Sequence, residues 1–316
     1  MLLSKEDFMK PKISVLFSTY NESISELCQS IKSVLIQSFR NFEFIIVIDN
    51  PKNEKILQCV ENYRKKDNRI IIVKNKENIG LVNSLNKGIK YTKGDYIARM
   101  DADDICHPKR FEKQIAYLQK NNLDLIGCNA NIILNNKIIG QYKKPSFSSG
   151  VNFYLKNAFA SCLIHPTWFG KKEVFEKLNG YNTVIAAEDY EFLLRAYKAK
   201  FKIGNINQTL LDYRIREQSI SISQSYNQCF STLLCKKEIL GLNCLERWHF
   251  NKIKSVDKNK LAKSKSYISL FRQKKIEKKW CKSIWYLLLT LKTCPHFFIN
   301  KVINNIFLYI SKCLFH

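Results

Sequence analysis

Three carboxylates at the end of an apolar segment are the side chains whose types and spacing most directly suggest chemistry. Asp101, Asp103 and Asp104 follow an apolar-rich run that begins at Tyr96, and no neighbouring lysine relieves their mutual repulsion. In an extended chain, side chains alternate between two faces, so Asp101 and Asp103 point the same way. A pair of carboxylates suits a hard divalent cation. We therefore predict a metal site, with the alternative that Asp104 caps a helix entering through Pro108.

The segments before this cluster predict how it is positioned. Continuous apolar runs predict buried strands at residues 12–18, 43–48 and 69–73, and amphipathic segments predict helices at residues 23–38, 52–66 and 108–120. This alternation is typical of a parallel sheet covered on both faces, where ligands bind beyond the carboxyl ends of the strands. We expect residues 19–22, Asp49 and residues 101–104 to converge on one crevice. The chain has no glycine-rich motif for dinucleotide or P-loop chemistry.

The order of elements changes after residue 124. Residues 125–134 and 137–142 predict a strand pair, residues 145–160 look irregular, and residues 171–178 predict a helix. A further helix opens at Glu188 and Asp189. By spacing alone these two carboxylates are favoured as charges that stabilise a helix N-terminus, although a carboxylate held there is also well placed as a general base.

Composition limits the class of protein. The chain has 316 residues and a formal net charge of +25. Residues 230–316 contain 18 Lys and Arg against 4 Asp and Glu, so +14 of this charge lies in the last part of the chain. The eleven cysteines are scattered without a Cys-x-x-Cys pair, which favours a reducing compartment over a disulfide framework. Because no signal peptide or bilayer-spanning run is evident, we expect a cytosolic protein with a basic tail.

Taken in order, these segments resemble family 2 glycosyltransferases of the GT-A fold, the inverting type common in bacterial surface-polysaccharide synthesis. The similarity covers roughly two thirds of the chain and lies in the order of short motifs more than in any one of them. These motifs are STYNE at 18–22, IVID at 46–49, NIGL at 78–81, LNKG at 85–88, ARMDADD at 98–104, HPT at 165–167, GY at 180–181, EDY at 188–190, YR at 213–214 and SIS at 219–221.

The resemblance implies a set of residues that bind a nucleotide-sugar donor. Asp103 would bind Mn²⁺ or Mg²⁺ together with Asp101, and Asp101 would also contact the ribose or sugar. The metal would neutralise the charge of the departing diphosphate. The other donor-binding positions that match the family are Thr19, Tyr20, Glu22, Asp49 and Asn86.

The resemblance also assigns roles on the acceptor side. Asp189 matches the catalytic base that deprotonates the acceptor hydroxyl, with Glu188 beside it. His165 lies near the acceptor or is simply a loop histidine before a rigid proline. Arg216 stands where the family often has a metal-ligating histidine, and we expect it to pair with the diphosphate oxygens or else to face solvent.

The expected fold class is α/β, a GT-A nucleotide-sugar-binding fold whose mostly parallel central sheet is flanked by helices. We expect a glycosyltransferase domain over residues 1–225, with a donor-binding half at about 11–104 and an acceptor-side half at about 105–225. Residues 226–316 would form a helical, basic C-terminal extension. Within it, residues 252–316 interleave lysine with aromatic and apolar residues, which suits an anionic membrane surface or helices packed on the domain.

The function expected on these grounds is metal-dependent, inverting transfer of a sugar from a UDP-sugar to a saccharide or lipid-linked saccharide. The enzyme would be cytoplasmic, on the inner face of the cell membrane if the basic tail binds lipid. One alternative is a nucleic-acid-binding protein that uses the basic tail, but the acidic residues at 101–104 and the lack of a recognition motif disfavour it. The other is a non-catalytic scaffold subunit with the same fold.

Overall fold

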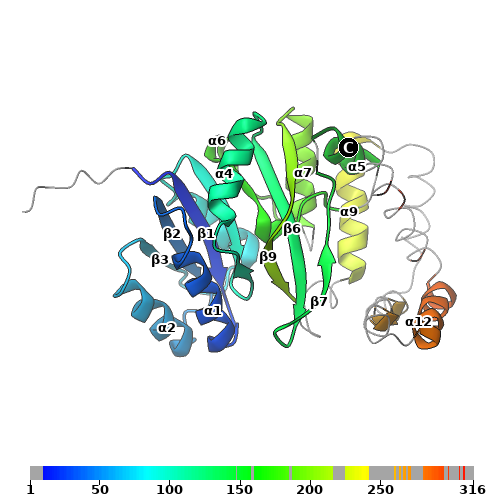
Figure 1. Ribbon diagram of the computed structural model, residues 1–316, viewed down its shortest axis with the longest axis horizontal. Coiled ribbons are helices and arrows are strands. Elements are labelled where there is room, and N and C mark those ends of the chain that lie inside the picture. The colour runs from blue at the N-terminus through cyan, green and yellow to red at the C-terminus, as the bar shows by residue number, and fades with distance from the viewer. Residues whose placement is uncertain are drawn as a thin grey trace, which may run out of the picture.

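The computed structural model describes residues 10–146, 148–157, 160–184, 187–215, 225–241 and 280–294, and a few isolated positions between 260 and 309. In this part of the chain one nine-stranded sheet forms the centre of the molecule (Figure 1). The strand order is β3-β2-β1-β4-β8-β6-β9-β5, and β7 pairs with β6 outside this path.

The N-terminal half of the sheet is parallel, as predicted. Its strands are β1 (Ile13–Thr19), β2 (Phe42–Ile48), β3 (Ile70–Lys74) and β4 (Tyr96–Asp101), joined by α1 (Ile24–Leu35), α2 (Glu54–Arg64) and α3 (Gly80–Ile89). Ser18 is in register with Asp101, and Thr19 with Ile48. The three strand ends therefore stop at the same level, which brings residues 19–22, Asp49 and the acidic cluster to one edge of the sheet.

The first helix is fixed by the residues that follow the first strand. The Ser23 hydroxyl accepts a hydrogen bond from the Glu26 backbone N–H at 3.3 Å and donates one to the Glu26 carboxylate at 2.7 Å. This reciprocal cap satisfies an otherwise unpaired donor of the first turn. It also fixes where the 19–22 loop ends and the helix begins.

The C-terminal half mixes parallel and antiparallel strands. Its elements are β5 (Ile105–Cys106), α4 (Arg110–Lys120), β6 (Leu125–Leu134), β7 (Lys137–Tyr142), α5 (Ser148–Asn157), the 3-10 turn η1 (His165–Thr167), β8 (Phe169–Lys171), α6 (Lys172–Lys177), α7 (Glu188–Lys198) and β9 (Ile203–Arg214). β8 pairs antiparallel with both β4 and β6, and so joins the two halves, while β9 runs parallel to β6. The predicted pair β6–β7 is confirmed, with Asn135 and Asn136 at positive φ in its turn.

One local prediction is wrong. Residues 145–160 were expected to be irregular, but α5 occupies residues 148–157. Its buried Val151 and Leu155 lie four residues apart, and Tyr154 is buried beside them. The serines and asparagines of this segment conceal an apolar face that is only one side of a short helix.

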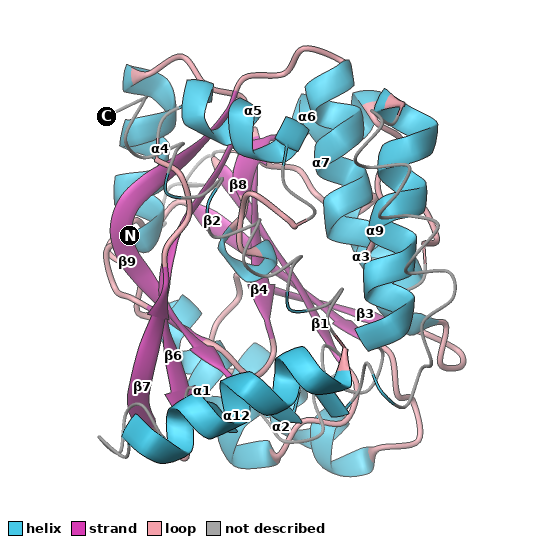
Figure 2. Ribbon diagram, turned by 90° about the vertical axis from the view of Figure 1, so that its right-hand side faces the viewer, coloured by secondary structure: helices cyan, strands magenta, loops and turns pink. Residues whose placement is uncertain are grey.

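Two apolar cores cover the two faces of the sheet. One contains side chains of α1, α2 and α4, and the other contains side chains of α3, α5, α6 and α7. The helix α9 (Ser225–Leu240) adds the buried Cys235 to the second core and lies beside α7 (Figure 2). The domain boundary at 225/226 stays a prediction, and the first helix beyond it packs on the sheet domain.

Most of residues 252–316 lie outside the described part of the chain, apart from α12 (Trp280–Thr293) and isolated positions. Among the described residues, no helix is both long enough and apolar enough to cross a bilayer.

A buried carboxylate secures the start of β4. Glu43 on β2 accepts hydrogen bonds from the Ser14 hydroxyl at 2.6 Å and from the Lys93 backbone N–H at 2.5 Å. The Gly94 N–H donates to the same Ser14 hydroxyl at 2.8 Å. A Cβ at Gly94 would lie 2.7 Å from the carbonyl carbon of Ile13 and from the backbone nitrogen of Ser14. The close approach of these two backbones requires glycine.

We therefore expect Gly94→Ala to reduce the free energy of unfolding by about 1–3 kcal/mol, because the backbone of β1 must move to admit the methyl group. Urea unfolding would measure the change. Gly140→Ala is the matched control, since its nearest new contact is at 3.6 Å. Equal effects of the two substitutions would contradict this account of Gly94.

Candidate active site

The carboxyl ends of β1, β2 and β4 open into a cleft of about 820 Å³. Its walls are formed by the loop after β1, the acidic loop after β4, the η1 segment and the start of α7. Eight of the residues predicted from the sequence line it together: Tyr20, Glu22, Asp49, Asp101, Asp103, His165, Glu188 and Asp189. The convergence of strand ends expected from the sequence is confirmed.

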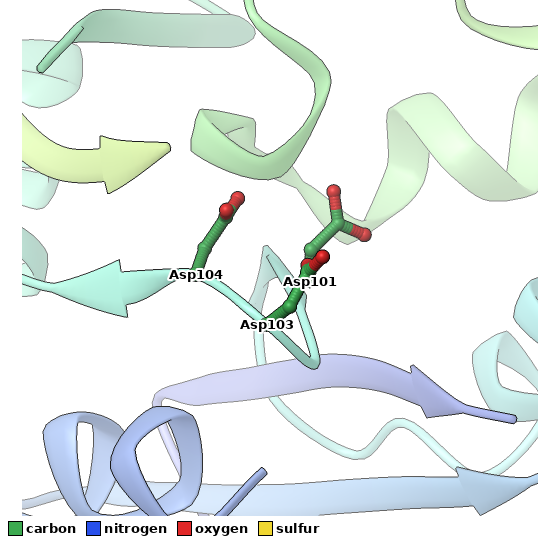
Figure 3. A group of neighbouring side chains, drawn as sticks. All are labelled: Asp101, Asp103 and Asp104. Carbon is green, nitrogen blue, oxygen red and sulfur yellow. The ribbon is translucent and has the colours of Figure 1, made fainter. Parts of the chain in front are cut away.

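The acidic loop between β4 and β5 holds Asp101, Asp103 and Asp104 close together. One carboxylate oxygen from each lies within 4.8 Å of the others (Figure 3). Asp104 does not cap the following helix, as the alternative interpretation supposed, because α4 begins after Lys109 without a side-chain cap. It is buried instead, and its Oδ1 accepts a hydrogen bond from the Arg214 backbone N–H at 2.8 Å. Burial, with the charges of the other two carboxylates, raises the pKa of Asp104 well above its ordinary value.

The repulsion within this loop is relieved by Arg99, a residue to which the sequence analysis gave no role. Arg99 precedes Asp101 by two positions on the same face of β4, and its guanidinium pairs with the Asp101 Oδ1. The side chain is only 1% exposed, and its Nε has no hydrogen-bond partner in the described part of the chain. A buried cation thus holds one oxygen of Asp101 and orients that carboxylate at the edge of the cleft.

Arg214, at the end of β9, ties the acidic loop to the second half of the sheet. Besides its backbone bond to Asp104, its Nε donates to the Asp103 carbonyl oxygen at 2.8 Å. Two further bonds from the same guanidinium reach Asn136 at 2.7 Å and Gln29 at 3.0 Å. The loop is therefore held from elements more than a hundred residues away.

The acidic loop fits a divalent cation on the evidence of its own atoms. Three carboxylates within 4.8 Å supply hard oxygen ligands, and a buried Asp104 Oδ2 has no hydrogen-bond partner among the described residues. Like charges held this close favour either a bound cation or protonation. Arg99 offsets only part of the charge, because it pairs with one oxygen of one carboxylate.

On the donor side, Glu22 organises the loop after β1. Its Oε2 accepts hydrogen bonds from the Thr19 hydroxyl at 2.6 Å and from the Tyr20 N–H at 2.9 Å. Thr19 is buried behind the cleft wall, and the Tyr20 ring is exposed. This arrangement leaves the Tyr20 ring free of the protein core.

Asp49 and Asn86 have most of their polar atoms engaged. The Asp49 carboxylate accepts from the Ile79 N–H at 2.9 Å and the Gly80 N–H at 3.0 Å, which closes the turn into α3. Asn86 donates to the Tyr181 carbonyl at 2.7 Å and accepts from the Tyr181 N–H at 2.8 Å. Thr19 and Asn86 are not among the cleft-lining residues, so their contacts indicate positioning; direct donor binding by them stays a prediction.

Glu188 and Asp189 form the opposite wall at the first turn of α7. The residue at the N-cap is Ala187, which provides no side-chain bond, and Asp189 Oδ1 accepts from the Tyr190 N–H at 2.7 Å. Burial and the neighbouring Asp189 charge raise the pKa of Glu188 to about 7. Burial also raises the pKa of Asp189, opposed by the Tyr190 N–H and by the Lys144 ammonium. Glu188 therefore exchanges its proton near neutral pH.

Two neighbours of this pair complete the wall. Lys144 donates a hydrogen bond to the Ser161 carbonyl at 2.5 Å, and burial lowers its pKa against the attraction of nearby anionic groups that include Asp189. The Ser161 hydroxyl donates to the Leu163 carbonyl at 2.7 Å, and its proximity to Asp189 favours the ionised form of that carboxylate. Neither Lys144 nor Ser161 was singled out in the sequence, because neither belongs to a recognised motif.

His165 lies on the floor of the cleft as a neutral imidazole. Its Nε2 is 3.0 Å from the Tyr181 hydroxyl, and its ring packs edge-on against Trp168 with the centroids 4.7 Å apart. Burial and the nearby Arg99 cation lower the pKa of His165 well below its ordinary value. His165 lines the cleft, and its role on the acceptor side stays a prediction. Arg216 lies outside the described residues, and its role stays a prediction.

With this geometry established, the comparison with protein families is decisive. Residues 14–178 match the sequence profile of glycosyl transferase family 2. The chain belongs to this family. The match spans the donor loop after β1, the acidic loop and the η1 segment, so the family 2 protein is an enzyme that transfers sugars, as the resemblance implied.

Curated relatives agree with this assignment. An uncharacterized glycosyltransferase of Methanocaldococcus jannaschii is 36% identical over 69% of this chain and 76% of its own length. The O-antigen biosynthesis glycosyltransferase WbnJ of Escherichia coli is 34% identical over 71% of this chain and 89% of its own. A UDP-Glc:alpha-D-GlcNAc-diphosphoundecaprenol beta-1,3-glucosyltransferase of Escherichia coli, WfgD, is 32% identical over 72% and 85%.

Solved structures share the fold. TarS of S. aureus, in complex with UDP-GlcNAc, superposes with a TM-score of 0.58 at 15% identity, over 93% of this chain and 90% of that one. The mannosyltransferase PcManGT of Pyrobaculum calidifontis, in complex with GDP-Man and Mn²⁺, gives 0.58 at 14% identity, over 90% and 87%. The family 2 chain thus has the predicted GT-A fold.

The raised pKa of Glu188 predicts a pH-dependent effect of Glu188→Gln on stability. A carboxyl whose pKa is higher in the folded state than in the unfolded chain contributes stability below the unfolded value and loses it as pH rises through about 7. The neutral variant avoids that loss. We expect it to melt a few degrees above the wild type at about pH 8 and to show a smaller gain at about pH 5. A gain of the same size at both pH values would exclude this explanation.

Proposed function

We propose that this enzyme transfers a sugar from a UDP-sugar, with inversion and with a divalent cation, to a hydroxyl of a saccharide or lipid-linked saccharide in surface-polysaccharide synthesis. The observation that carries the proposal is that one cleft is lined both by the acidic loop, which suits a metal-bound diphosphate, and by Asp189 at the start of α7. A donor and a base are both needed for the reaction, and this cleft offers a place for each.

The donor class is supported by what structures with the same fold contain. TarS is seen with UDP-GlcNAc and with UDP, and PcManGT with GDP-Man. WfgD is named for UDP-Glc. These are nucleotide sugars and, in one case, the nucleotide UDP alone; UDP or a UDP-sugar occurs most often, which favours a UDP-sugar for this chain. The exposed Tyr20 ring is available for stacking on the base.

In the proposed complex Asp103 and Asp101 hold Mn²⁺ or Mg²⁺, as the relation to PcManGT with its Mn²⁺ supports. The bound cation would supply charge neutralisation for the departing diphosphate. Arg99 keeps Asp101 turned in place, and Arg214 keeps the loop backbone from spreading under the repulsion of its carboxylates. The two arginines position the ligands without entering the reaction.

Asp189 is the proposed base. It would take the proton of the acceptor hydroxyl while that oxygen attacks the anomeric carbon opposite the diphosphate. The new carbon–oxygen bond forms as the bond to the diphosphate oxygen breaks, and the electron pair leaves with the nucleoside diphosphate. One displacement inverts the anomeric centre, so no nucleophilic carboxylate is required. Lys144 and Ser161 favour the ionised form of Asp189 before the acceptor arrives.

The names of two relatives support the proposed class of acceptor. WfgD is named for a diphosphoundecaprenol-linked acceptor, and WbnJ for O-antigen biosynthesis. His165 and Glu188 on the same side of the cleft are placed to contact acceptor hydroxyls. Seven cysteines whose side chains the structure describes are free thiols, which supports a cytoplasmic site for the reaction.

We expect Asp189→Asn to lower turnover by about 10²- to 10⁴-fold, because an amide cannot accept the proton. UDP release with a panel of UDP-sugars and saccharide acceptors would measure it. Asp95→Asn serves as the control and should keep full activity, because Asp95 is a half-exposed carboxylate paired with Lys10 and Lys12 just before β4, at the opposite end of the strand from the acidic loop. Full activity in Asp189→Asn with intact folding would reject Asp189 as the base.

The metal requirement is tested by thermal unfolding with UDP, GDP, CMP or no nucleotide, each with and without Mn²⁺. UDP with Mn²⁺ should raise the melting temperature by several degrees, since a ligand at about 100 times its dissociation constant adds about 2.7 kcal/mol. Asp103→Asn should abolish the part of the shift that depends on Mn²⁺. A shift with UDP that ignores Mn²⁺ would overturn metal dependence. No response to any nucleotide, with salt-sensitive RNA binding instead, would favour the nucleic-acid alternative.

A further inference from the structure

The helix α12 has one face turned towards the rest of the chain. Thr290 and Cys294 on this face are buried. The Thr290 carbonyl accepts a hydrogen bond from the buried Ser264 at 3.5 Å, and the Tyr286 ring lies 6.2 Å from the Tyr267 ring. These contacts hold α12 against Ser264 and Tyr267 and fix which of its faces points outwards.

The opposite face of α12 is apolar and exposed. Ile284, Leu288 and Leu291 are 55%, 54% and 39% exposed, and Trp285 beside them is 60% exposed. The spacing of i, i+4 and i+7 places the three aliphatic side chains in one row along the helix. Four of the eleven large hydrophobic side chains exposed in the described part of the chain lie on this one helix. We call Ile284, Trp285, Leu288 and Leu291 the outer face of α12.

Lysine side chains lie near both ends of this outer face. Lys282 and Lys292, near the two ends of α12, are both exposed. Residues 230–316 contain 18 Lys and Arg against 4 Asp and Glu, a net +14 in 87 residues. An apolar surface with a lysine near each end, in a part of the sequence rich in lysine, complements an anionic bilayer, because lysines reach the lipid phosphates while tryptophan and leucine enter the acyl boundary.

We propose that the outer face of α12 docks the enzyme on the surface of an anionic lipid bilayer. The helix would lie in the plane of the interface. With 14 residues it is about 21 Å long, too short to cross a hydrocarbon core of about 30 Å. The attachment is therefore peripheral and depends on both the apolar row and the lysine charge.

The position of α12 relates the bilayer to the cleft. In Figures 1 and 2, α12 lies at the lower end of the molecule, and in Figure 1 this is the end at which β9 finishes. The last residues of β9, Tyr213 and Arg214, line the cleft. Docking through α12 would thus bring the cleft end of the molecule towards the lipid surface. That position would give the cleft access to a lipid-linked acceptor. This consequence rests on the proposed function, whereas the docking itself does not.

Cosedimentation of the full chain with phosphatidylcholine vesicles, with or without phosphatidylglycerol, tests the proposal. We expect binding only when phosphatidylglycerol is present, and the double variant Leu288→Glu, Leu291→Glu to bind at least about tenfold more weakly. Ile36→Glu is the control. Ile36 is 54% exposed at the C-terminal end of α1, so a glutamate there should be tolerated and should not weaken binding. Melting temperatures of all three proteins would show that each is folded.

Fluorescence provides a second, local measurement. The emission of Trp285 should shift to shorter wavelength on vesicle binding, and Trp285→Phe should remove that part of the shift while binding persists. Unchanged binding by the double glutamate variant would overturn the proposal. The proposal would also be overturned if the wild-type protein does not bind anionic vesicles but self-associates, and the double variant does not self-associate. The outer face would then join two copies of the chain. Vesicle binding with no transferase activity would instead count against the proposed function alone.

Discussion

The site depends on holding three carboxylates together against their mutual repulsion. Asp101, Asp103 and Asp104 lie within 4.8 Å of one another, one of them buried. Free loops with this sequence would spread apart, because like charges at such distances repel strongly in a medium less polar than water. Arg99 prevents this from beneath the loop and Arg214 from its far side. The acidic cluster is therefore a product of tertiary structure, although its three residues lie within four positions of the sequence.

The same constraint explains why the sheet needs both of its halves. The parallel half ends its strands at one level and brings the donor loop and the acidic loop side by side. The mixed half returns through β8 and β9, and β9 delivers Arg214 to the acidic loop. The start of α7 then places Asp189 across the same cleft. A domain with the parallel half alone would keep Arg99 beside its acidic loop but would lack Arg214 and the proposed base Asp189.

Short-range pattern predicted a large part of this arrangement. Apolar runs predicted the strands. Because the carboxyl ends of neighbouring parallel strands lie at the same edge of a sheet, Asp49 and Asp101 were then expected at one edge. The partners of those residues were not accessible in this way. Arg214 contacts Asp104 across 110 residues, and tertiary packing brings Lys144 near Asp189. Arg99 stood within the recognised motif, yet only the burial of β4 makes it the partner of Asp101. The helix α5 escaped notice because its apolar face is short.

The amide of Asn86 connects the two walls of the cleft. Both of its polar atoms are bonded to the backbone of Tyr181, and a Cβ on Gly180 would collide with it. The helix α3 and the 180–181 turn therefore form one mechanical unit. The start of α3 is joined to Asp49 on the donor side, and the Tyr181 hydroxyl is joined to His165. A series of hydrogen bonds therefore runs from Asp49 through α3, Asn86 and the 180–181 turn to His165, so the two walls of the cleft are joined to each other as well as facing each other.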